Sequence, residues 1–298
     1  MTASKRANIL TSTGIEIDQS ADKIKQYSVP GTFIAAGIAQ ILPPTAFHCQ
    51  RPPFGARQVC RTEASLMAPW QLSRLAIDSG DAPPAFMVRF DAGQFDPSLF
   101  SRHSVALPAS IARSVQKRQA EFFFGRYCAS MALAELGMPA GEIAIGASRE
   151  PVWPGAVIGS ITHTGTVAAA VALPRDHHAG VGIDIEHIVG VNQHAALRSV
   201  VVNADEFAYL SSIAAALPLD LSLTIAFSAK ESFFKAVFGH VRRHIGFDEV
   251  IVAELSPSNG AIVLELRESL SDRLRRGQRC QCHFREMRPG LVLTSFLW

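Results

Sequence analysis

The chain has 298 residues, of which 48% are hydrophobic and 18% are charged, so it is long enough to form two packed units. A net charge of +2 is too mild for a nucleic-acid-binding protein, and we exclude that class. The five cysteines form no zinc-type or secreted pattern, and we see no signal peptide and no apolar run of membrane-spanning length, so we expect a cytoplasmic protein with reduced thiols.

Residues 1–84 mix polar and apolar tracts and are broken by three Pro-Pro pairs. We treat them as an N-terminal extension to which the sequence assigns no role. The next segment, residues 85–178, predicts a strand near 86–90 and a long helix over 110–136. That helix has Ser110 as a candidate N-cap and Gly137 at its C-terminal stop.

A hairpin follows, with a strand from Val157 to His163, a turn over 164–166 and a return strand through Leu173. A single histidine at the end of a strand is more often structural than catalytic. Arginines on a helix, such as Arg118 and Arg126, are more often solvated than bound to a ligand. On their own, these residues therefore predict no site.

The segment 181–187 alternates apolar and acidic residues, which is typical of a half-buried strand. Asp184 and Glu186 should therefore project from one face while Ile183 and Ile185 enter the core. Two close carboxylates repel each other, and a divalent cation such as Mg²⁺ would relieve that repulsion. The alternative is an edge strand with two solvated acids.

A capping-box pattern at Ser228 and Glu231 predicts that a helix begins near Ser228. Glu231 and Lys235 would lie one turn apart on this helix. A helix N-terminus favours anions, and Lys230 and Lys235 add positive charge suited to a pyrophosphate. The alternative is an ordinary helix start with an ion pair inside the helix.

The rest of the segment 179–298 predicts a helix over 204–212, four strands near 249–255, 261–266, 280–287 and 291–297, and a helix over 268–276. Two successive combinations of helix and sheet favour an α+β fold.

Four motifs in this order resemble those of the 4′-phosphopantetheinyl transferases, in particular the bacterial enterobactin- and surfactin-synthase branch. The motifs are KRQAEFFFGR at 117–126, SITHT at 160–164, GIDIE at 182–186 and FSAKESFFK at 227–235. The resemblance implies two pseudo-symmetric halves in one monomer, residues 85–178 and 179–298, with the metal site in the second half. It also implies a coenzyme A site in the cleft between the halves.

The resemblance further implies transfer of the 4′-phosphopantetheine arm of coenzyme A to a serine of an apo carrier protein, with release of adenosine 3′,5′-bisphosphate. By motif position, Asp184, Glu186 and Glu231 would hold Mg²⁺ (or Mn²⁺), and Glu231, or a water that it orients, would accept the serine proton. The coenzyme phosphates would be bound by the remaining motif residues, which are Arg118, Arg126, His163, Lys230 and Lys235. Of these, Lys235 also belongs to the catalytic pair with Glu231.

The sequence departs from the motif pattern at Ile145, where some relatives carry a basic residue; Arg149 is the nearest substitute. Two other functions remain open at this point. One is a non-catalytic protein that binds coenzyme A or a carrier. The other is a metal-dependent phosphohydrolase, which the helical spacing of Glu231 and Lys235 disfavours.

Overall fold

The structure is a computed structural model that describes the strands at 8–10, 15–18 and 24–26, and residues 70–298 except 79, 81, 140, 177, 288 and 289. Most of the expected N-terminal extension, including Cys49 and Cys60, lies outside the described residues. Its three strands form an antiparallel sheet of their own. They are β1 (Asn8–Leu10), β2 (Ile15–Asp18) and β3 (Ile24–Gln26).

The N-terminal half, from β4 to β9, is built on a four-stranded antiparallel sheet in the order β4-β5-β9-β8. Its strands are β4 (Gln71–Leu75), β5 (Ala85–Arg89), β8 (Val157–Thr164) and β9 (Val167–Pro174). The predicted hairpin is confirmed, since β8 pairs with β9 from Val157↔Pro174 to Thr164↔Val167. A short hairpin and three helices complete the half: β6 (Ala144–Ile145), β7 (Pro151–Val152), α1 (Leu99–Arg102), α2 (Ala109–Ala112) and α3 (Gln116–Glu135).

The single helix predicted over 110–136 is wrong, because α2 and α3 are separate helices. Val115 has an extended backbone (ψ 153°) at the N-cap position of α3, so the chain turns between them. The predicted stop is confirmed by Gly137, whose φ of +71° is the left-handed conformation that glycine adopts readily.

The C-terminal half, from β10 to β14, is built on a five-stranded antiparallel sheet in the order β10-β14-β13-β12-β11. Its strands are β10 (Val181–His187), β11 (Val250–Ser256), β12 (Ala261–Leu266), β13 (Arg279–Met287) and β14 (Leu291–Leu297). Its α-helices are α4 (His194–Val200), α5 (Ala204–Ser212) and α6 (Leu219–Val241). These strands and α5 confirm the sequence-based predictions to within a few residues.

Two predictions for this half are wrong. Residues 268–276 form bends rather than a helix, and the hydroxyls of Ser269 and Ser271 accept backbone N–H groups of Arg276 and Arg273. Serine side chains that bond nearby backbone in this way compete with helix formation. The second error concerns the start of α6, which begins at Leu219 instead of near Ser228.

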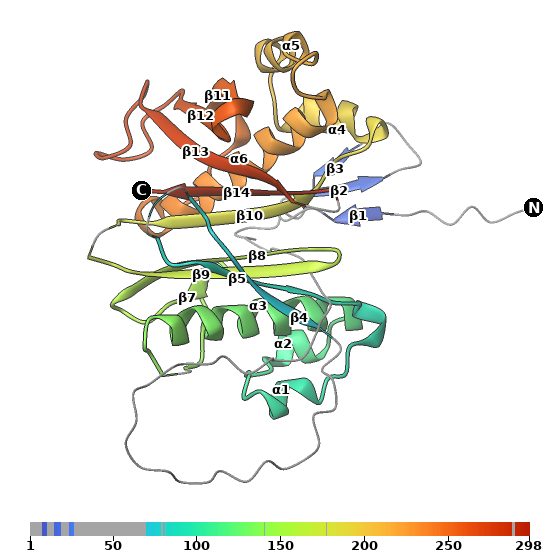
Figure 1. Cartoon of the computed structure of the whole chain (residues 1–298), viewed down its shortest axis with the longest axis vertical. Helices are drawn as coiled ribbons and strands as arrows, with labels where there is room; N and C mark the ends of the chain where they lie inside the picture. The colour runs from blue at the N-terminus through green and yellow to red at the C-terminus, as the bar shows by residue number, and fades with distance from the viewer. Residues whose placement is uncertain are drawn as a thin grey trace, which may run out of the picture.

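The two halves stack as four layers, helix–sheet–sheet–helix (Figure 1). The helix α6 covers the outer face of the C-terminal sheet, and α3 covers the outer face of the N-terminal sheet. Between the sheets lies a shared apolar cluster that includes Met87, Ile158, Ile183, Ile185 and Leu293. The α+β class predicted from the sequence is therefore confirmed.

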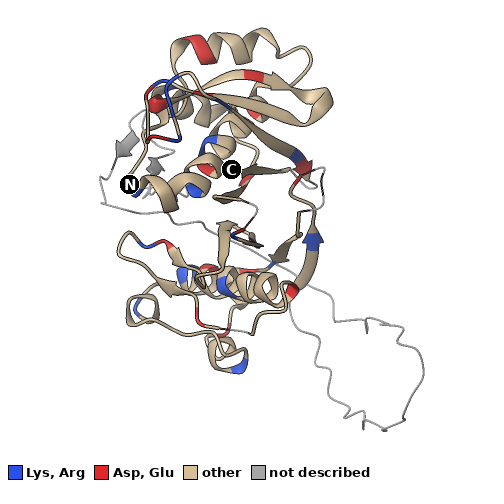
Figure 2. Cartoon of the chain, turned by 90° about the vertical axis from the view of Figure 1, so that its left-hand side faces the viewer, with Lys and Arg blue, Asp and Glu red and all other residues tan. Residues whose placement is uncertain are grey.

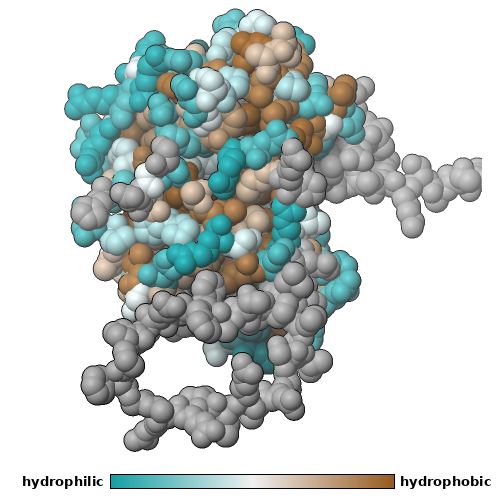
Figure 3. Space-filling model, in the orientation of Figure 1, coloured by the Kyte–Doolittle hydropathy of each residue, from teal (hydrophilic) through white to brown (hydrophobic). Residues whose placement is uncertain are grey.

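The outer surface mixes polar and apolar side chains. On the face seen in Figure 3, hydrophobic patches lie between hydrophilic residues. Across the described residues, none of the helices combines the length and the apolar character that a membrane crossing requires.

Candidate functional site

The helix α6 lies directly against the strand β10, and glycine permits this close approach. A Cβ on Gly182 would lie 1.8 Å from the carbonyl oxygen of Ser232, and one on Gly180 would lie 2.0 Å from that of Ala236. Any side chain at these positions would separate the helix from the strand. The glycine that opens the GIDIE motif thus brings the acidic strand and α6 together.

Asp184 is the centre of the contacts between β10 and α6. It is fully buried, and the ammonium of Lys235 lies 2.6 Å from its Oδ1. The hydroxyl of Thr162 donates to Oδ1 at 2.9 Å, and the hydroxyl of Ser228 donates to Oδ2 at 2.8 Å. A buried charge of this kind needs such partners, because desolvation without compensation is costly. Asp184 is therefore a held, buried carboxylate rather than a solvated acid on an edge strand.

Glu186 lies close enough to both Asp184 and Glu231 to interact with them electrostatically. The pKa of Glu186 is raised well above its usual value, first by burial and then by the negative charges of Asp184 and Glu231. The Lys235 ammonium opposes this rise, and so does the Thr164 hydroxyl, which lies 3.5 Å from Oε2. Glu231 itself is 1% exposed and lies one helical turn before Lys235 on α6.

Oxygen donors of this kind suit a hard divalent cation such as Mg²⁺. Within the part of the chain that the structure describes, however, no three His, Cys, Asp or Glu side chains are arranged to hold a metal ion by themselves. The positive charge next to Asp184 is Lys235. The three carboxylates expected to hold a metal thus interact electrostatically, but they form no complete metal-binding cluster among the described residues.

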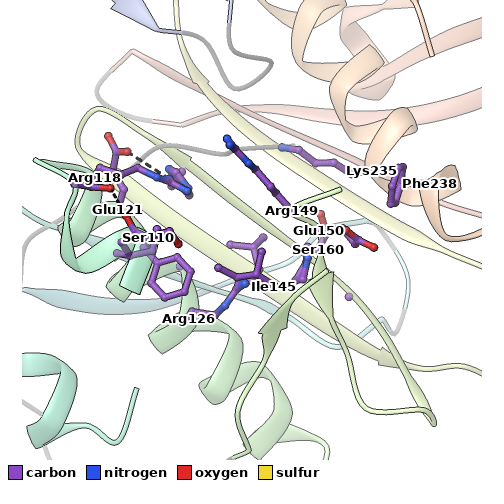
Figure 4. Close-up of a pocket in the computed structure, with 18 residues that line it drawn as sticks. Ser110, Arg118, Glu121, Arg126, Ile145, Arg149, Glu150, Ser160, Lys235 and Phe238 are labelled. Carbon is purple, nitrogen blue, oxygen red and sulfur yellow. Dashed lines mark hydrogen bonds and ion pairs between the residues drawn. The ribbon is translucent and has the colours of Figure 1, made fainter. Parts of the chain in front are cut away.

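A cavity of about 290 Å³ lies beside Lys235 and between the two halves. It is lined by five side chains with cationic or imidazole groups: Arg118, Arg126, Arg149, His163 and Lys235. Figure 4 labels the arginines and the lysine. The five side chains come from α3, from the loop between β6 and β7, from β8 and from α6. Figure 2 shows lysine and arginine positions on helices of both halves, on either side of the central strands. The structure therefore brings four of the predicted site residues together with Arg149.

Two carboxylates, Glu121 and Glu150, also line this cavity. Glu121 lies 3.7 Å from both the Lys117 ammonium and the Arg118 guanidinium. Burial raises the pKa of Glu121, and the two cations act against that rise. The cavity nevertheless keeps more basic than acidic groups, which favours an anionic ligand.

His163 is buried and neutral. Arg118 Nη1 lies 3.3 Å from His163 Nε2, and because a guanidinium can only donate, Nε2 must accept. The pKa of His163 is held well below its usual value by burial, then by the positive charges of Arg118 and Lys235. The remaining hydrogen is therefore on Nδ1, which has no hydrogen-bond partner among the described residues.

Arg126 lines the same cavity. Burial and the nearby Arg118 lower its pKa to about 10, so it stays cationic at neutral pH. Its guanidinium stacks over Phe122 at 4.8 Å from the ring centroid. The buried Nε has no hydrogen-bond partner within the described ranges. An anion in the cavity would satisfy such a donor.

Arg149, the basic residue nearest to Ile145 in the motif region, lines the same cavity as Ile145. It is exposed, has a left-handed backbone (φ 66°) and reaches toward the cavity from the loop between β6 and β7 (Figure 4). Its charge lowers the pKa of Arg118, so the two guanidinium groups repel each other. A phosphate between them would remove this repulsion.

The structure does not bring Lys230 to the cavity, which corrects the expectation that it contacts phosphates. Lys230 is fully buried on the other face of α6, with its ammonium 2.8 Å from Glu206 Oε1. It also donates to the carbonyls of Val201 and Phe247. The expectation depended on a helix that begins near Ser228. Because α6 begins nine residues earlier, Lys230 is in the middle of a helix whose two sides are both covered.

Sequence reasoning missed two features near the carboxylates. The start of α6 could have been read from Pro218 and Asp220, since proline and acidic residues are typical of the first turn of a helix. The hydroxyl contacts of Thr162 and Ser228 with Asp184 had no signal in the sequence, because they join three separate elements.

A second cavity, of about 590 Å³, adjoins the first. Both are lined by Lys235 and Phe238, and the second continues along α6 toward Trp298. The second volume falls within the range of small-molecule sites, about 300–1,000 Å³, and the first lies just below the lower end of that range. Together they form an extended space along the junction of the halves.

Two family models match the chain. One is described as the 4′-phosphopantetheinyl transferase N-terminal domain and matches residues 107–173. The other is described as the 4′-phosphopantetheinyl transferase superfamily and matches residues 180–285. The first range includes the arginines and His163 of the cavity, and the second includes the three carboxylates and Lys235.

Curated proteins give the same result. The chain is 38% identical over 168 residues to enterobactin synthase component D of Salmonella typhi, a match that covers 55% of this chain and 68% of that protein. It is 40% identical over 146 residues to enterobactin synthase component D of Escherichia coli, covering 48% of this chain and 68% of that protein. It is also 38% identical over 151 residues to the 4′-phosphopantetheinyl transferase PptT of Mycobacterium tuberculosis, covering 50% and 64%.

Proposed function

The chain belongs to the 4′-phosphopantetheinyl transferase superfamily, and on that premise we propose that it moves the 4′-phosphopantetheine arm of coenzyme A to a serine of an apo carrier protein. The observation that carries this proposal is the position of Lys235. This one side chain contacts Asp184 and also lines the cavity that holds the arginines. A phosphate there would lie between the carboxylates and the cationic cavity.

In the proposed reaction, the serine oxygen forms a bond to the phosphorus that carries the pantetheine arm. The bond from that phosphorus to the bridging oxygen breaks, and adenosine 3′,5′-bisphosphate leaves. The serine proton passes to Glu231, or to a water that Glu231 orients. A positioned general base typically contributes about 10²–10⁴-fold to the rate.

The cationic side chains have separate roles in this proposal. Lys235 neutralises charge on the pyrophosphate, which is electrostatic stabilisation of the transition state. Arg118, Arg126 and Arg149, with the Nδ1–H of His163, hold the phosphates of the adenosine part. The cavity that these residues line supports this assignment.

Asp184, Glu186 and Glu231 would hold Mg²⁺, and the bound ion would supply positive charge that stabilises the phosphoryl transfer. Mg²⁺ commonly binds through one or two carboxylates and takes further ligands from water and substrate phosphates. A complete protein cage is therefore not required. The raised pKa of Glu186 supports this part of the proposal, because a nearby divalent cation would relieve the repulsion that causes it.

The proposal is tested with fluorescent coenzyme A, Mg²⁺ and a panel of apo carrier domains. Because relatives are enterobactin synthase components, carriers of siderophore synthesis come first, followed by polyketide and fatty-acid carriers. We expect a mass gain of one phosphopantetheine on the carrier serine, lost on addition of a chelator and lost in Asp184→Ala and Glu231→Ala. Coenzyme A binding without labelling of any carrier would instead indicate a non-catalytic binding protein, and phosphate release without labelling a phosphohydrolase.

A further inference from the structure

The two halves meet at the strands β8 and β10, which belong to different sheets but lie against each other. β8 is the last strand of the N-terminal sheet, and β10 is the first strand of the C-terminal sheet. In Figure 1 they form the two adjacent central layers of the molecule. Backbone N–H groups of β10 that face this junction need partners, because a buried donor without one is costly.

Side-chain hydroxyls of β8 supply these partners. Ile183 N donates to Ser160 Oγ at 3.0 Å, and Ile185 N donates to Thr162 Oγ1 at 3.2 Å. Ser160 and Thr162 are two residues apart on a strand, so both hydroxyls project from the same face. Their spacing matches that of Ile183 and Ile185 on β10. The junction is therefore a ladder of hydroxyl-to-backbone hydrogen bonds.

Ser160 contacts only the backbone of Ile183, whereas Thr162 also contacts the side chain of Asp184. A hydroxyl has one hydrogen, and that of Thr162 is donated to Asp184 Oδ1 at 2.9 Å, while its oxygen accepts from Ile185 N. Both capacities point at consecutive residues of β10, so the hydroxyl cannot rotate without losing one of them. Thr162 is 1% exposed, which keeps water from replacing either bond.

A second hydroxyl holds the other oxygen of the same carboxylate. Ser228 on α6 is fully buried and donates to Asp184 Oδ2 at 2.8 Å. Thr294 on β14 lies 2.9 Å from the Ser228 hydroxyl and 2.7 Å from that of Ser232. With Lys235 on Oδ1, each oxygen of Asp184 has a donor in a fixed direction.

We propose that Thr162 and Ser228 are positioning residues for the transfer reaction: from opposite sides, their hydroxyls hold the carboxylate of Asp184 in the orientation in which it takes a divalent cation beside a phosphorylated ligand. The inference rests on the proposed function. It explains why a threonine of the N-terminal half contacts an acid of the C-terminal half. Because these hydrogen bonds preorganise the carboxylate, Asp184 does not need to reorient when the cation binds.

The test uses the full chain with Mn²⁺ as a spectroscopic probe, and free Mn²⁺ is measured by electron paramagnetic resonance in the presence of coenzyme A. Thr162→Val keeps the shape but removes the hydroxyl, and Thr162→Ser keeps the hydroxyl. We expect Thr162→Val to weaken Mn²⁺ binding by about 10–100-fold, as is typical when a residue that orients a metal ligand is lost. Thr162→Ser should stay within about threefold of wild type on the same scale.

Ser160→Ala is the matched control. It removes a hydroxyl from the same ladder but leaves the donors of Asp184 in place. A merely structural role for Thr162 would lower the melting temperature in Thr162→Val and Ser160→Ala alike, with the same Mn²⁺ affinity as wild type in both. That outcome would overturn the inference.

Ser228→Ala provides a second variant if Thr162→Val does not fold. It should weaken Mn²⁺ binding in the same way, and wild-type affinity in Ser228→Ala would overturn the inference for the pair. If the wild-type chain binds no Mn²⁺ with coenzyme A and labels no carrier, the proposed function falls and the inference with it. If the wild type binds Mn²⁺ and labels carriers while both hydroxyl variants match it, only the inference falls.

Discussion

At the residue scale, the site at the junction of β10 and α6 has more negative than positive side chains. Three carboxylates interact at the junction of β10 and α6, and Lys235 is the cation that contacts Asp184. The remaining repulsion is concentrated on Glu186, whose pKa is raised well above its usual value. Binding sites often contain groups that repel each other, and this repulsion lowers the stability of the folded protein when no ligand is bound.

Glu186 should therefore destabilise the metal-free protein at neutral pH. A raised pKa in the folded state means that stability falls as pH rises from the usual value of 4.5 through the folded pKa. We predict that Glu186→Gln melts at a higher temperature than wild type at pH 8 in a chelator, and that the difference disappears near pH 4. A gain of about 2–4 °C would correspond to about 1 kcal/mol for a domain of this size.

The measurement is differential scanning calorimetry across that pH range, with the exposed Glu142→Gln as the control. The same variant should lose carrier labelling, since it removes a proposed metal ligand. A melting temperature for Glu186→Gln at pH 8 equal to or below that of wild type would show that the acidic cluster is not strained in this way.

We expect Arg149 to bind the 3′-phosphate that distinguishes coenzyme A from 3′-dephospho-coenzyme A. A hydrogen bond to a charged group contributes about 1.5–3 kcal/mol, so we predict that Arg149→Ala raises the KM for coenzyme A about tenfold or more. The KM for 3′-dephospho-coenzyme A should change less than about twofold, since that ligand lacks the partner. Steady-state kinetics with both substrates check this.

Arg113→Ala is the control for Arg149, because Arg113 is exposed and does not line the cavity. If Arg149→Ala raised the KM for both coenzymes by the same factor, Arg149 would contact a different phosphate. Retention of both KM values would remove it from the coenzyme site.

At the element scale, α6 connects the site to the core of the C-terminal half. One face of this helix presents Ser228, Glu231 and Lys235 toward β10, and the other contains the buried pair of Lys230 with Glu206. Glu206 also accepts from the backbone N–H of Val252 and of Asn203. The pair therefore joins α5, α6 and β11 beneath the site.

Lys230→Met should accordingly destabilise the protein without changing coenzyme A recognition. Removal of one partner from a buried ion pair typically costs about 3–5 kcal/mol, because the other charge is left buried. We predict a clearly lower urea midpoint than wild type, with an unchanged KM for coenzyme A in the folded fraction. Arg113→Met, at an exposed position, serves as the stability control. A higher KM for coenzyme A with unchanged stability would instead indicate that Lys230 contacts the coenzyme phosphates.

At the scale of the whole molecule, the two halves share apolar surface. Ile183 and Ile185 of β10, with Leu293 of β14, pack in one cluster with Met87 and Ile158 of the N-terminal sheet. If the two halves were separated, each would expose its part of this cluster to water. A small domain with less buried apolar area is less stable on its own. The sequence-based division into residues 85–178 and 179–298 remains a prediction about structure and does not imply two autonomous folding units.

We predict that the isolated segment 179–298 does not fold to a native-like state, whereas the full chain unfolds in one cooperative transition. The measurement is amide NMR dispersion of the fragment, together with coincidence of fluorescence and circular dichroism unfolding curves for the full chain. A well-dispersed spectrum of the fragment, or two separate transitions of the full chain, would contradict this expectation.

The sequence by itself determined the fold class and most of the strands around the site. Period-two alternation predicted β10, turn residues predicted the β8–β9 hairpin, and Gly137 marked the end of α3, because these signals depend on local backbone chemistry. The motif residues Arg118, Arg126, His163 and Lys235 were also named from the sequence, and the structure places them around one cavity.

Only the tertiary structure decided where α6 begins, that Lys230 belongs to the core, and that Thr162 and Ser228 hold Asp184. Each of these depends on the packing of segments far apart in the chain. The capping pattern at Ser228 is locally valid, but burial of both faces of α6 extended the helix past it, because tertiary packing outweighs a weak local preference.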